Sequence, residues 1–389
     1  MFYVLIALRA RLRQLGRFDA GVKEPNLAEL LDYVALGTVA DVVPFDRTNR
    51  ILVQQGLQRI RTGAAHPGIA ALLKIAGRDP RWLTAEDLAF AVAPRLNAAG
   101  RIEDMTLGID CLLAEDTELA VRKAQQLNAL NEQRREIEQQ MKADALKAVG
   151  ALERTGLFER QQGICLYDDA WHQGVIGLVA SKIKDRCAQP VIAFAPGKNA
   201  ELKGSARSIP GLHMRDLLND IATRNPGVLT RFGGHAMAAG LSIEHRHLDT
   251  FRELFAQAVS SRLRDTDNEL SVQSDGELQP EHYQIATAEL IKRAGPWGPS
   301  FPEPAFDAEF DVLQQRIVGE QHLKLTLRIP GTERPVDGIA FFVDEPGRWM
   351  GCGKIRAAYR LDVNDFRNVQ NLQIKIDYME AELPSPRRA

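Results

Sequence analysis

The sequence predicts a multidomain chain of the α/β class, on three observations about the spacing of its apolar residues. Residues 1–105 and 115–150 carry apolar residues at helical spacing. From residue 163 to Leu263, short apolar runs alternate with amphipathic helical segments, which is typical of an α/β domain. Beyond residue 272, short runs of alternating apolar and polar residues are separated by turns, which indicates a small β-barrel or sandwich.

The composition is that of a soluble globular protein of two or three domains. The chain has 389 residues, of which 45% are hydrophobic and 26% are charged. Its net charge of −2 gives no overall attraction to nucleic acid, so a polyanion site has to be a local patch. Its four cysteines show no C-x-x-C spacing, which excludes the usual zinc and disulfide patterns and fits a reducing cytoplasm.

The first part of the chain is predicted to be helical. The apolar run in residues 1–16 is too short to span a bilayer and lacks the flanks of a signal peptide, so no membrane contact is expected. We expect a buried helix there, with its arginines near its C-terminal end, inside a larger fold. Further helices are expected at residues 27–44, 49–61 and 66–77. Residues 115–150 predict a long, exposed connecting helix.

The second and third parts follow the change of pattern. In the α/β part, strands are expected at 163–169, 190–196, 202–208 and 241–243, and helices at 175–187, 212–222 and 247–263. Residues 264–283 are polar and read partly as a linker. Strands of the barrel or sandwich are expected at 305–319, 322–329, 337–343, 355–366 and 371–380, and the tail 383–389 is expected to fray.

Two motifs of the helical part suggest phosphate or metal chemistry. Asp41 stands in the apolar stretch GTVADVVP, where it either caps or pairs locally or ligates Mg²⁺ or Mn²⁺, ions that prefer oxygen. In PRLNAAGRI, Arg95, Asn97 and Arg101 surround small residues. Two arginines beside a close backbone approach suit a phosphate, and the alternative is a turn with surface arginines.

Three more motifs lie in the α/β part. Trp171 and His172 fall between a strand and a helix, where anions bind, although both side chains would also fit a core. In KGSARSIPG, strand spacing places Ser205 and Arg207 on one face with Lys203, as a phosphate clamp or a half-exposed edge.

The last of these motifs is RFGGHAMAAG. Its glycines, Gly233 and Gly234, permit unusual backbone geometry before His235. That histidine either donates a hydrogen bond to a phosphate or is a satisfied core residue. A cleft between domains would gather all five motifs.

Taken in order, five stretches closely resemble the RecJ family of single-stranded-DNA-specific exonucleases, within the DHH phosphoesterase superfamily. They are ALGTVADVVP, APRLNAAGRI, WHQGVIGLVASKI, GSARSIPGLH and GGHAMAAG. The resemblance covers nearly the whole chain. It implies an incomplete DHH catalytic domain at 1–108, a helical connector at 109–150, a DHHA1 substrate-binding domain at 151–265 and a C-terminal OB-fold at 272–385.

The resemblance also implies a function. Family members degrade single-stranded DNA from the 5′ end with Mn²⁺ or Mg²⁺, in DNA recombination and repair. Asp41 would ligate a metal, while Arg95, Asn97 and Arg101 would contact the scissile or a neighbouring phosphate. The DHHA1 pocket that holds the DNA 5′ end would contain Ser205 and Arg207 and would be lined by Gly233, Gly234 and His235. Trp171 and His172 would be further substrate-binding residues. On the OB-fold, Lys354, Arg356 and Arg360 are chosen by charge and strand spacing as contacts to the DNA backbone.

One departure from the family shapes the expectation for activity. The family's early aspartate motifs and its Asp-His-His motif precede the segment with which this chain begins, and no Asp-His-His occurs in the sequence. The expectation is a truncated chain that is inactive alone, because a two-metal site needs several ligands. The alternatives are a non-catalytic single-stranded-DNA-binding fragment or a DHH phosphodiesterase acting on short oligonucleotides. A cytoplasmic monomer is expected, working with a single-strand-binding protein and a helicase.

Overall fold

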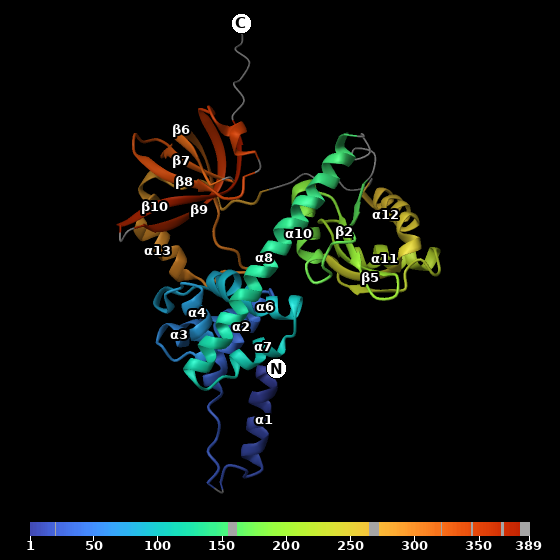
Figure 1. Ribbon diagram of the computed structural model, residues 1–389. Helices are drawn as coiled ribbons and strands as arrows, with labels where there is room; N and C mark the ends of the chain where they lie inside the picture. The colour runs from blue at the N-terminus through green and yellow to red at the C-terminus, as the bar shows by residue number, and fades with distance from the viewer. Residues whose placement is uncertain are drawn as a thin grey trace. The chain divides into compact units, whose positions relative to one another are not determined.

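The computed structural model describes residues 1–19, 21–154, 162–263, 272–319, 321–343, 345–366 and 369–381. It divides into two compact units, which are described separately. The barrel unit contains residues 1–65, 79–90 and 270–389, and the sheet unit contains residues 66–78 and 91–269. The predicted α/β class is confirmed: the chain has a long helix, a sheet whose strands alternate with helices, and a closed barrel (Figure 1).

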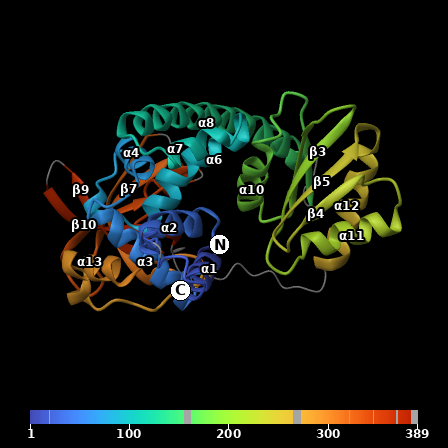
Figure 2. The same cartoon turned by 90° about the horizontal axis from the view of Figure 1, so that it is seen from below.

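In the sheet unit, four helices precede the sheet. They are α4 (Pro67–Ile75), α6 (Ala93–Ile102), α7 (Thr106–Leu112) and α8 (Thr117–Arg154). The long helix α8 was expected to be exposed, but one of its faces is buried. Its residues Ala120, Ala124 and Leu127, at helical spacing, are fully covered where α8 packs against α4, α6 and α7 (Figure 2). Helix α8 therefore forms part of the core of the helices α4, α6 and α7, in addition to connecting these helices to the sheet.

The five-stranded sheet has the order β1-β2-β3-β5-β4, with only β1 and β2 parallel. Its strands are β1 (Ile164–Tyr167), β2 (Val191–Pro196), β3 (Glu201–Arg207), β4 (Arg231–Gly234) and β5 (Ala238–Glu244). Helix α10 (Ile176–Cys187) packs on one face together with α8. Helices α11 (Met214–Arg224) and α12 (Leu248–Leu263) cover the other face. Strand β4 was not predicted, because its residues do not alternate between apolar and polar.

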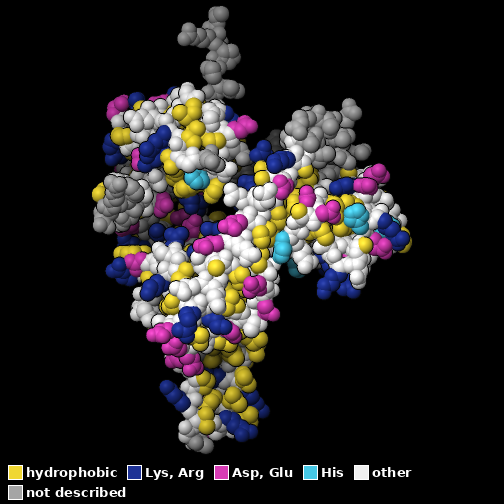
Figure 3. Space-filling model, in the orientation of Figure 1, with side chains coloured by type: hydrophobic (Ala, Val, Ile, Leu, Met, Phe, Trp, Pro, Cys, Tyr) yellow, Lys and Arg dark blue, Asp and Glu magenta, His cyan; other side chains and the backbone are white. Residues whose placement is uncertain are grey.

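The helical part of the barrel unit begins with α1 (Phe2–Gln14), followed by η1 (Leu27–Leu30), α2 (Leu31–Ala40), α3 (Arg47–Arg61) and α5 (Ala85–Asp87). The prediction of a buried first helix is wrong. None of the residues of α1 is buried, and Tyr3, Val4 and Leu8 are more than half exposed. Figure 3 shows yellow hydrophobic side chains at the surface of the end of the molecule where Figure 1 places α1. The apolar residues of α1 are distributed around the helix, so no single face concentrates them.

The barrel is closed, with the strand order β10-β8-β7-β6-β9 and pairing of β9 with β10. Its strands are β6 (Phe306–Val318), β7 (His322–Arg328), β8 (Pro335–Ala340), β9 (Lys354–Phe366) and β10 (Val369–Ala381). Helix α13 (Ile285–Ala294), which was not predicted, packs on β9 and β10. The tail 383–389 and the first part of the linker, 264–271, lie outside the described residues. No described helix combines the length and apolar character that a bilayer crossing requires.

Candidate nucleic-acid interface

A pocket of about 740 Å³ opens in the sheet unit, where three segments meet. They are the C-terminal end of α6, the loop that leads from β1 into α10, and the strands β3, β4 and β5. The lining residues are Gly100, Arg101, Ile102, Glu103, His172, Gln173, Gly174, Ile176, Gly177, Lys203, Gly204, Ser205, Arg207, Arg231, Phe232, Gly240, Leu241 and Ser242. Four of these are cationic and one, Glu103, is a carboxylate, so the pocket favours an anion.

Strand β3 presents the predicted clamp. Its residues alternate between partly exposed and buried, which places Lys203, Ser205 and Arg207 on one face as strand spacing required. Arg207 Nη1 donates to Ser205 Oγ at 3.1 Å and to the carbonyl oxygen of Ala206 at 2.9 Å. These bonds orient the guanidinium, and neither of them involves Nη2. Nη2 lies against Gly177, where a Cβ atom would stand 2.9 Å away.

The close approach at Gly177 brings Arg207 to the first turn of α10. The helix dipole favours an anion at the start of a helix. Here the Ile176 N–H donates to the His172 carbonyl oxygen at 3.3 Å and the Leu178 N–H to that of Val175 at 2.9 Å, which leaves the Gly177 N–H for a ligand. Ile176 and Gly177, the first two residues of α10, both line the pocket. A guanidinium and a helix N-terminus therefore face the same space, which is a suitable arrangement for phosphate oxygens.

Arg101, on α6, adds a second guanidinium. Its Nη1 donates to the carbonyl oxygen of Gly174 at 3.2 Å. Gly174 has to be glycine there, because a Cβ atom would come within 2.1 Å of the Arg101 carbonyl oxygen. Burial, and then the charge of Arg101, lower the pKa of Arg207. Neither arginine has a carboxylate partner within the part of the chain that the structure describes.

Other polar groups line the same pocket. His172 accepts a hydrogen bond from the Gly174 N–H through Nδ1 at 3.1 Å, so its Nε2 remains available. Lys203 Nζ pairs with Glu201 at 2.7 Å and donates to Ser242 Oγ at 2.9 Å. Arg231, on β4, is exposed and lines the pocket without a carboxylate partner among the described residues. The pocket thus offers one paired and three unpaired cations.

The remaining sequence-predicted residues of this unit lie outside the pocket lining. Trp171 is 6% exposed and belongs to the core beneath α10, so adjacent residues 171 and 172 have different surroundings. Gly233 and Gly234 lie in the hairpin of β4 and β5, where Gly234 has φ +147° and a Cβ atom would strike the Ala238 carbonyl oxygen. His235 is exposed in the same hairpin, and its N–H donates to Ala238 at 2.8 Å.

Arg95 and Asn97 also lie on α6 but away from the pocket lining. Arg95 Nε donates to Asn128 of α8 at 2.9 Å, and Asn97 is exposed. Burial, followed by the charge of Arg135, lowers the pKa of Arg95. Cations thus gather along the α6–α8 contact as well as in the pocket.

Asp41 lies in the barrel unit and is an exposed residue at the C-terminal end of α2. Its carboxylate suits Mg²⁺ or Mn²⁺ in chemical type. Among the residues that the structure describes, however, no three His, Cys, Asp or Glu side chains form a group that could hold a metal ion. A single exposed carboxylate does not fit a catalytic metal centre by itself.

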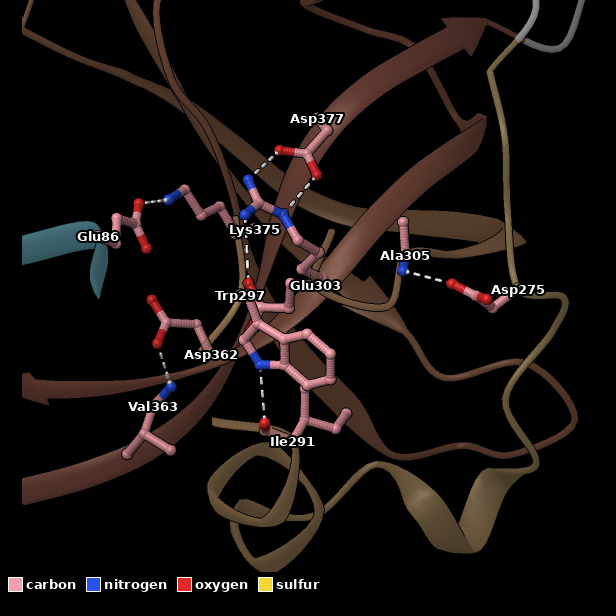
Figure 4. Close-up of polar contacts among 11 residues, drawn as sticks. Glu86, Asp275, Ile291, Trp297, Glu303, Ala305, Asp362, Val363, Lys375 and Asp377 are labelled. Atoms are coloured by element: carbon pink, nitrogen blue, oxygen red, sulfur yellow. Dashed lines mark hydrogen bonds and ion pairs between the residues drawn. The ribbon is translucent and has the colours of Figure 1, made fainter. Parts of the chain in front are cut away.

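The three predicted barrel cations are each engaged by carboxylates. Lys354 lies 3.9 Å from Asp311, and Arg356 pairs with Asp307 at 3.1 Å. Arg360 donates two hydrogen bonds of 2.7 Å to Asp377 and one of 3.2 Å to Glu303. Figure 4 draws these hydrogen bonds of Asp377 and Glu303 as dashed lines. The pair with Asp377 raises the pKa of Arg360. Arg360 is therefore the least available of the three for DNA.

Sequence reasoning missed several pocket residues. Gly177, Arg231 and Phe232 line the pocket, and none was singled out. A glycine in the first turn of a predicted helix, where Gly177 stands, was the available signal. Arg231 and Phe232 lie on the strand that showed no periodic pattern.

Comparisons with known proteins agree with this arrangement. Residues 160–261 match the family described as the DHHA1 domain, and residues 274–378 match the RecJ OB domain. The single-stranded-DNA-specific exonuclease RecJ of Dickeya dadantii is 51% identical over 381 residues, covering 97% of this chain and 66% of the relative. The RecJ of Escherichia coli is 50% identical over 379 residues, covering 97% of this chain and 65% of the relative. This chain therefore spans 65–66% of the length of these curated relatives.

Solved structures give the same result. Thermus thermophilus RecJ in complex with Mg²⁺ matches with a TM-score of 0.75 and 25% identity, covering 94% of this chain and 54% of that one. Its complex with Mn²⁺ matches with a TM-score of 0.77 and 26% identity, covering 94% and 51%. With both domain families matched and curated relatives about 50% identical along nearly its whole length, this chain belongs to the RecJ family.

Proposed function

We propose that this chain has the function of a RecJ-type 5′→3′ exonuclease that is specific for single-stranded DNA and acts in recombination and repair. One observation carries the proposal. Arg101 and Arg207 share a pocket at the N-terminus of α10 without a carboxylate partner among the described residues. Two such guanidiniums require an anion, and the relatives are named for single-stranded DNA.

The terminal 5′ phosphate is the proposed occupant of the pocket. Arg207 would bind one phosphate oxygen through Nη2, with Arg101 and the Gly177 N–H at the others. His172 would donate through Nε2, because its Nδ1 accepts the hydrogen bond from the Gly174 N–H. Trp171 would act from the core by supporting this loop, and Gly233, Gly234 and His235 would contact the strand beyond the pocket lining.

A divalent metal ion, Mn²⁺ or Mg²⁺, would supply Lewis acidity for hydrolysis and would need further ligands besides Asp41. We propose Asp41 as one ligand of this metal, and Arg95, Asn97 and Arg101 as contacts to the scissile or a neighbouring phosphate. Arg95 would do this through Nη2, since its Nε and Nη1 bond Asn128 and Ala91. A terminal phosphate held in a fixed pocket would make cleavage exonucleolytic.

A second candidate function is binding of single-stranded DNA without cleavage by this chain alone. It is favoured by Asp41, which is exposed and belongs to no group of three metal-ligating side chains among the described residues. A phosphodiesterase acting on short oligonucleotides is the weaker alternative, because a closed barrel of the RecJ OB family serves no purpose for a small substrate.

The wider setting is part of the proposal. A monomer in the cytoplasm would work beside a single-strand-binding protein and a helicase. We propose the domain limits 1–108 for the DHH part, 109–150 for the connector, 151–265 for the DHHA1 domain and 272–385 for the OB-fold. Within the DHH part, residues 66–78 and 91–108 belong to the same compact unit as α8 and the sheet.

An assay with a 5′-labelled single strand tests the function. The chain should bind a 5′-phosphorylated oligonucleotide more tightly than the same strand with a 5′ hydroxyl, and more tightly than a blunt duplex. Added Mn²⁺ then separates the two candidates, since release of mononucleotides indicates the exonuclease and binding alone indicates the non-catalytic function. Equal affinity for the phosphorylated and hydroxyl strands would contradict the assignment of the pocket.

A further inference from the structure

Two exposed phenylalanines and a partly exposed histidine gather at one end of the barrel, where β7 begins and β8 ends. Phe341 is 47% exposed and Phe342 is 75% exposed, directly after β8. His322 is the first residue of β7 and is partly exposed. Single exposed phenylalanines are ordinary, but two consecutive ones beside a histidine form a local apolar surface that needs a reason.

The histidine fixes both phenyl rings. Its ring centroid lies 5.3 Å from that of Phe341, at 74°, and 4.9 Å from that of Phe342, at 86°. Its Nδ1 accepts a hydrogen bond from the Phe342 N–H at 3.1 Å. The next residue, Val343, donates its N–H to the Gln321 carbonyl oxygen at 2.8 Å. The three rings therefore form a braced group on which a flat ligand can stack.

The backbone of Phe342 supports a functional reading. Its φ of +54° lies in the left-handed region, which is unfavourable for a bulky residue that is not glycine. Such a conformation persists only where the surroundings enforce it, and it tends to occur where a ligand is held. Here the enforcing contacts are those of His322 and Gln321, and the result is a phenyl ring turned into solvent.

The outer face of the barrel next to these rings carries a free cation. Leu323 and Leu325 of β7 point into the core, so His322 and Lys324 point outward. On β6, Val318 pairs with His322 and Arg316 pairs with Lys324, so Arg316 shares this outer face. Lys324 is paired with Asp337, whereas Arg316 is exposed and has no carboxylate partner within the described ranges.

We propose that Phe341, Phe342 and His322 form a stacking platform for a base of the single strand, with Arg316 binding an adjacent phosphate. Aromatic faces beside a cation match one nucleotide, which has a flat base and an anionic phosphate. An apolar peptide would use the rings but would give no role to the unpaired arginine. The proposal rests on the proposed function. It adds this outer face to the barrel contacts expected at Lys354, Arg356 and Arg360, each of which is paired with a carboxylate.

The test uses the full chain with two 5′-phosphorylated oligothymidylates, a trinucleotide that fills only the pocket and a long strand that extends beyond it. The double variant Phe341→Ala/Phe342→Ala should weaken binding of the long strand about 10-fold, within the range for loss of base stacking. Affinity for the trinucleotide should stay unchanged. Replacing single thymidines of the long strand by 2-aminopurine in turn should reveal a position whose fluorescence is quenched on binding, and the double variant should lose that quenching.

Matched variants make the result specific. Phe342→Trp should retain both affinity and quenching, because it keeps an aromatic face. Tyr378→Ala removes an exposed ring elsewhere on the barrel, where Tyr378 is 46% exposed, and should change neither quantity. Arg316→Ala should weaken binding of the long strand and reduce its salt dependence by about one unit of slope.

Two outcomes overturn the inference in distinguishable ways. If the long strand binds the double variant as tightly as it binds the original chain, the platform assignment is wrong and the proposed function stands. If the original chain binds neither oligonucleotide, the proposed function itself fails, and the platform fails with it.

Discussion

Replacing Arg207 by alanine should weaken binding of a 5′-phosphorylated strand without destabilising the sheet unit. The guanidinium is partly buried beside Arg101, and burial followed by that neighbouring charge lowers its pKa. A cation whose pKa is lower in the folded state is less stable there than in the unfolded chain. Because arginine stays protonated throughout the physiological range, this cost is present at every pH in that range. Removing the side chain relieves the cost, so folding stability should stay level or rise.

The binding loss follows from the atoms that remain free. Nη1 is engaged by Ser205 and Ala206, which leaves chiefly Nη2, against Gly177, to meet a phosphate oxygen. One hydrogen bond to a charged group contributes about 1.5–3 kcal/mol. At about 1.4 kcal/mol for each factor of ten, the dissociation constant should rise roughly 10- to 150-fold.

Fluorescence anisotropy with a 5′-phosphorylated single strand, together with thermal unfolding, measures both effects. Arg207→Lys keeps the charge but loses the planar fork, so its affinity should lie between those of the original chain and the alanine variant. Arg246→Ala removes an exposed arginine paired with Glu244 in the same unit and should leave affinity nearly unchanged. The reasoning would be refuted if Arg207→Ala bound the strand as tightly as the original chain. It would also be refuted if the variant were less stable and its unfolding explained the loss of affinity.

Two further substitutions test the packing arguments. Gly177→Ala should weaken binding several-fold, because its Cβ would lie 2.9 Å from Arg207 Nη2 and 3.0 Å from Ser205 Oγ and would displace the guanidinium. The contact with Ser205 offsets any gain in helix propensity, so stability should change by less than about 1 kcal/mol; anisotropy and calorimetry on the same sample measure the two quantities. Arg360→Met should lower the free energy of unfolding by about 2–4 kcal/mol, because it leaves Glu303 and Asp377 without their cation. Strand affinity at a temperature where that variant is folded should stay unchanged, and a loss as large as that of Arg207→Ala would show that Arg360 binds DNA.

Local sequence patterns were enough to predict the strand that carries the clamp. Side chains on a strand alternate between its faces, so the spacing of Lys203, Ser205 and Arg207 specified one face before any tertiary contact was known. The long helix α8, the alternation of strands and helices, and the barrel strands were predictable for the same reason. Each rests on a periodicity of neighbouring residues, and the structure confirms them.

Features that depend on distant residues could not be predicted. Arg360 carries the charge expected of a DNA contact, but Asp377 and Glu303, respectively 17 and 57 residues away, engage it. Trp171 and His172 are adjacent in sequence, and only the packing of α10 decides which of them enters the core. The same limit applies to Arg207, whose importance comes from the absence of a partner carboxylate among the described residues. Sequence gives the charges, whereas folding determines which of them are neutralised.

That distinction separates two kinds of DNA contact in this chain. With a net charge of −2, the chain would attract DNA, under the proposed function, where cations lack a carboxylate partner among the described residues, as at Arg101 and Arg207 in the pocket. Contacts of this kind release counterions and weaken as salt increases. Stacking on Phe341 and Phe342 involves no net charge, so its contribution should persist at high salt. Raising the salt concentration should therefore abolish the preference for a 5′ phosphate before it abolishes the preference for a long strand. If both preferences were lost at the same salt concentration, contacts to phosphates, and not to bases, would hold the DNA on the barrel.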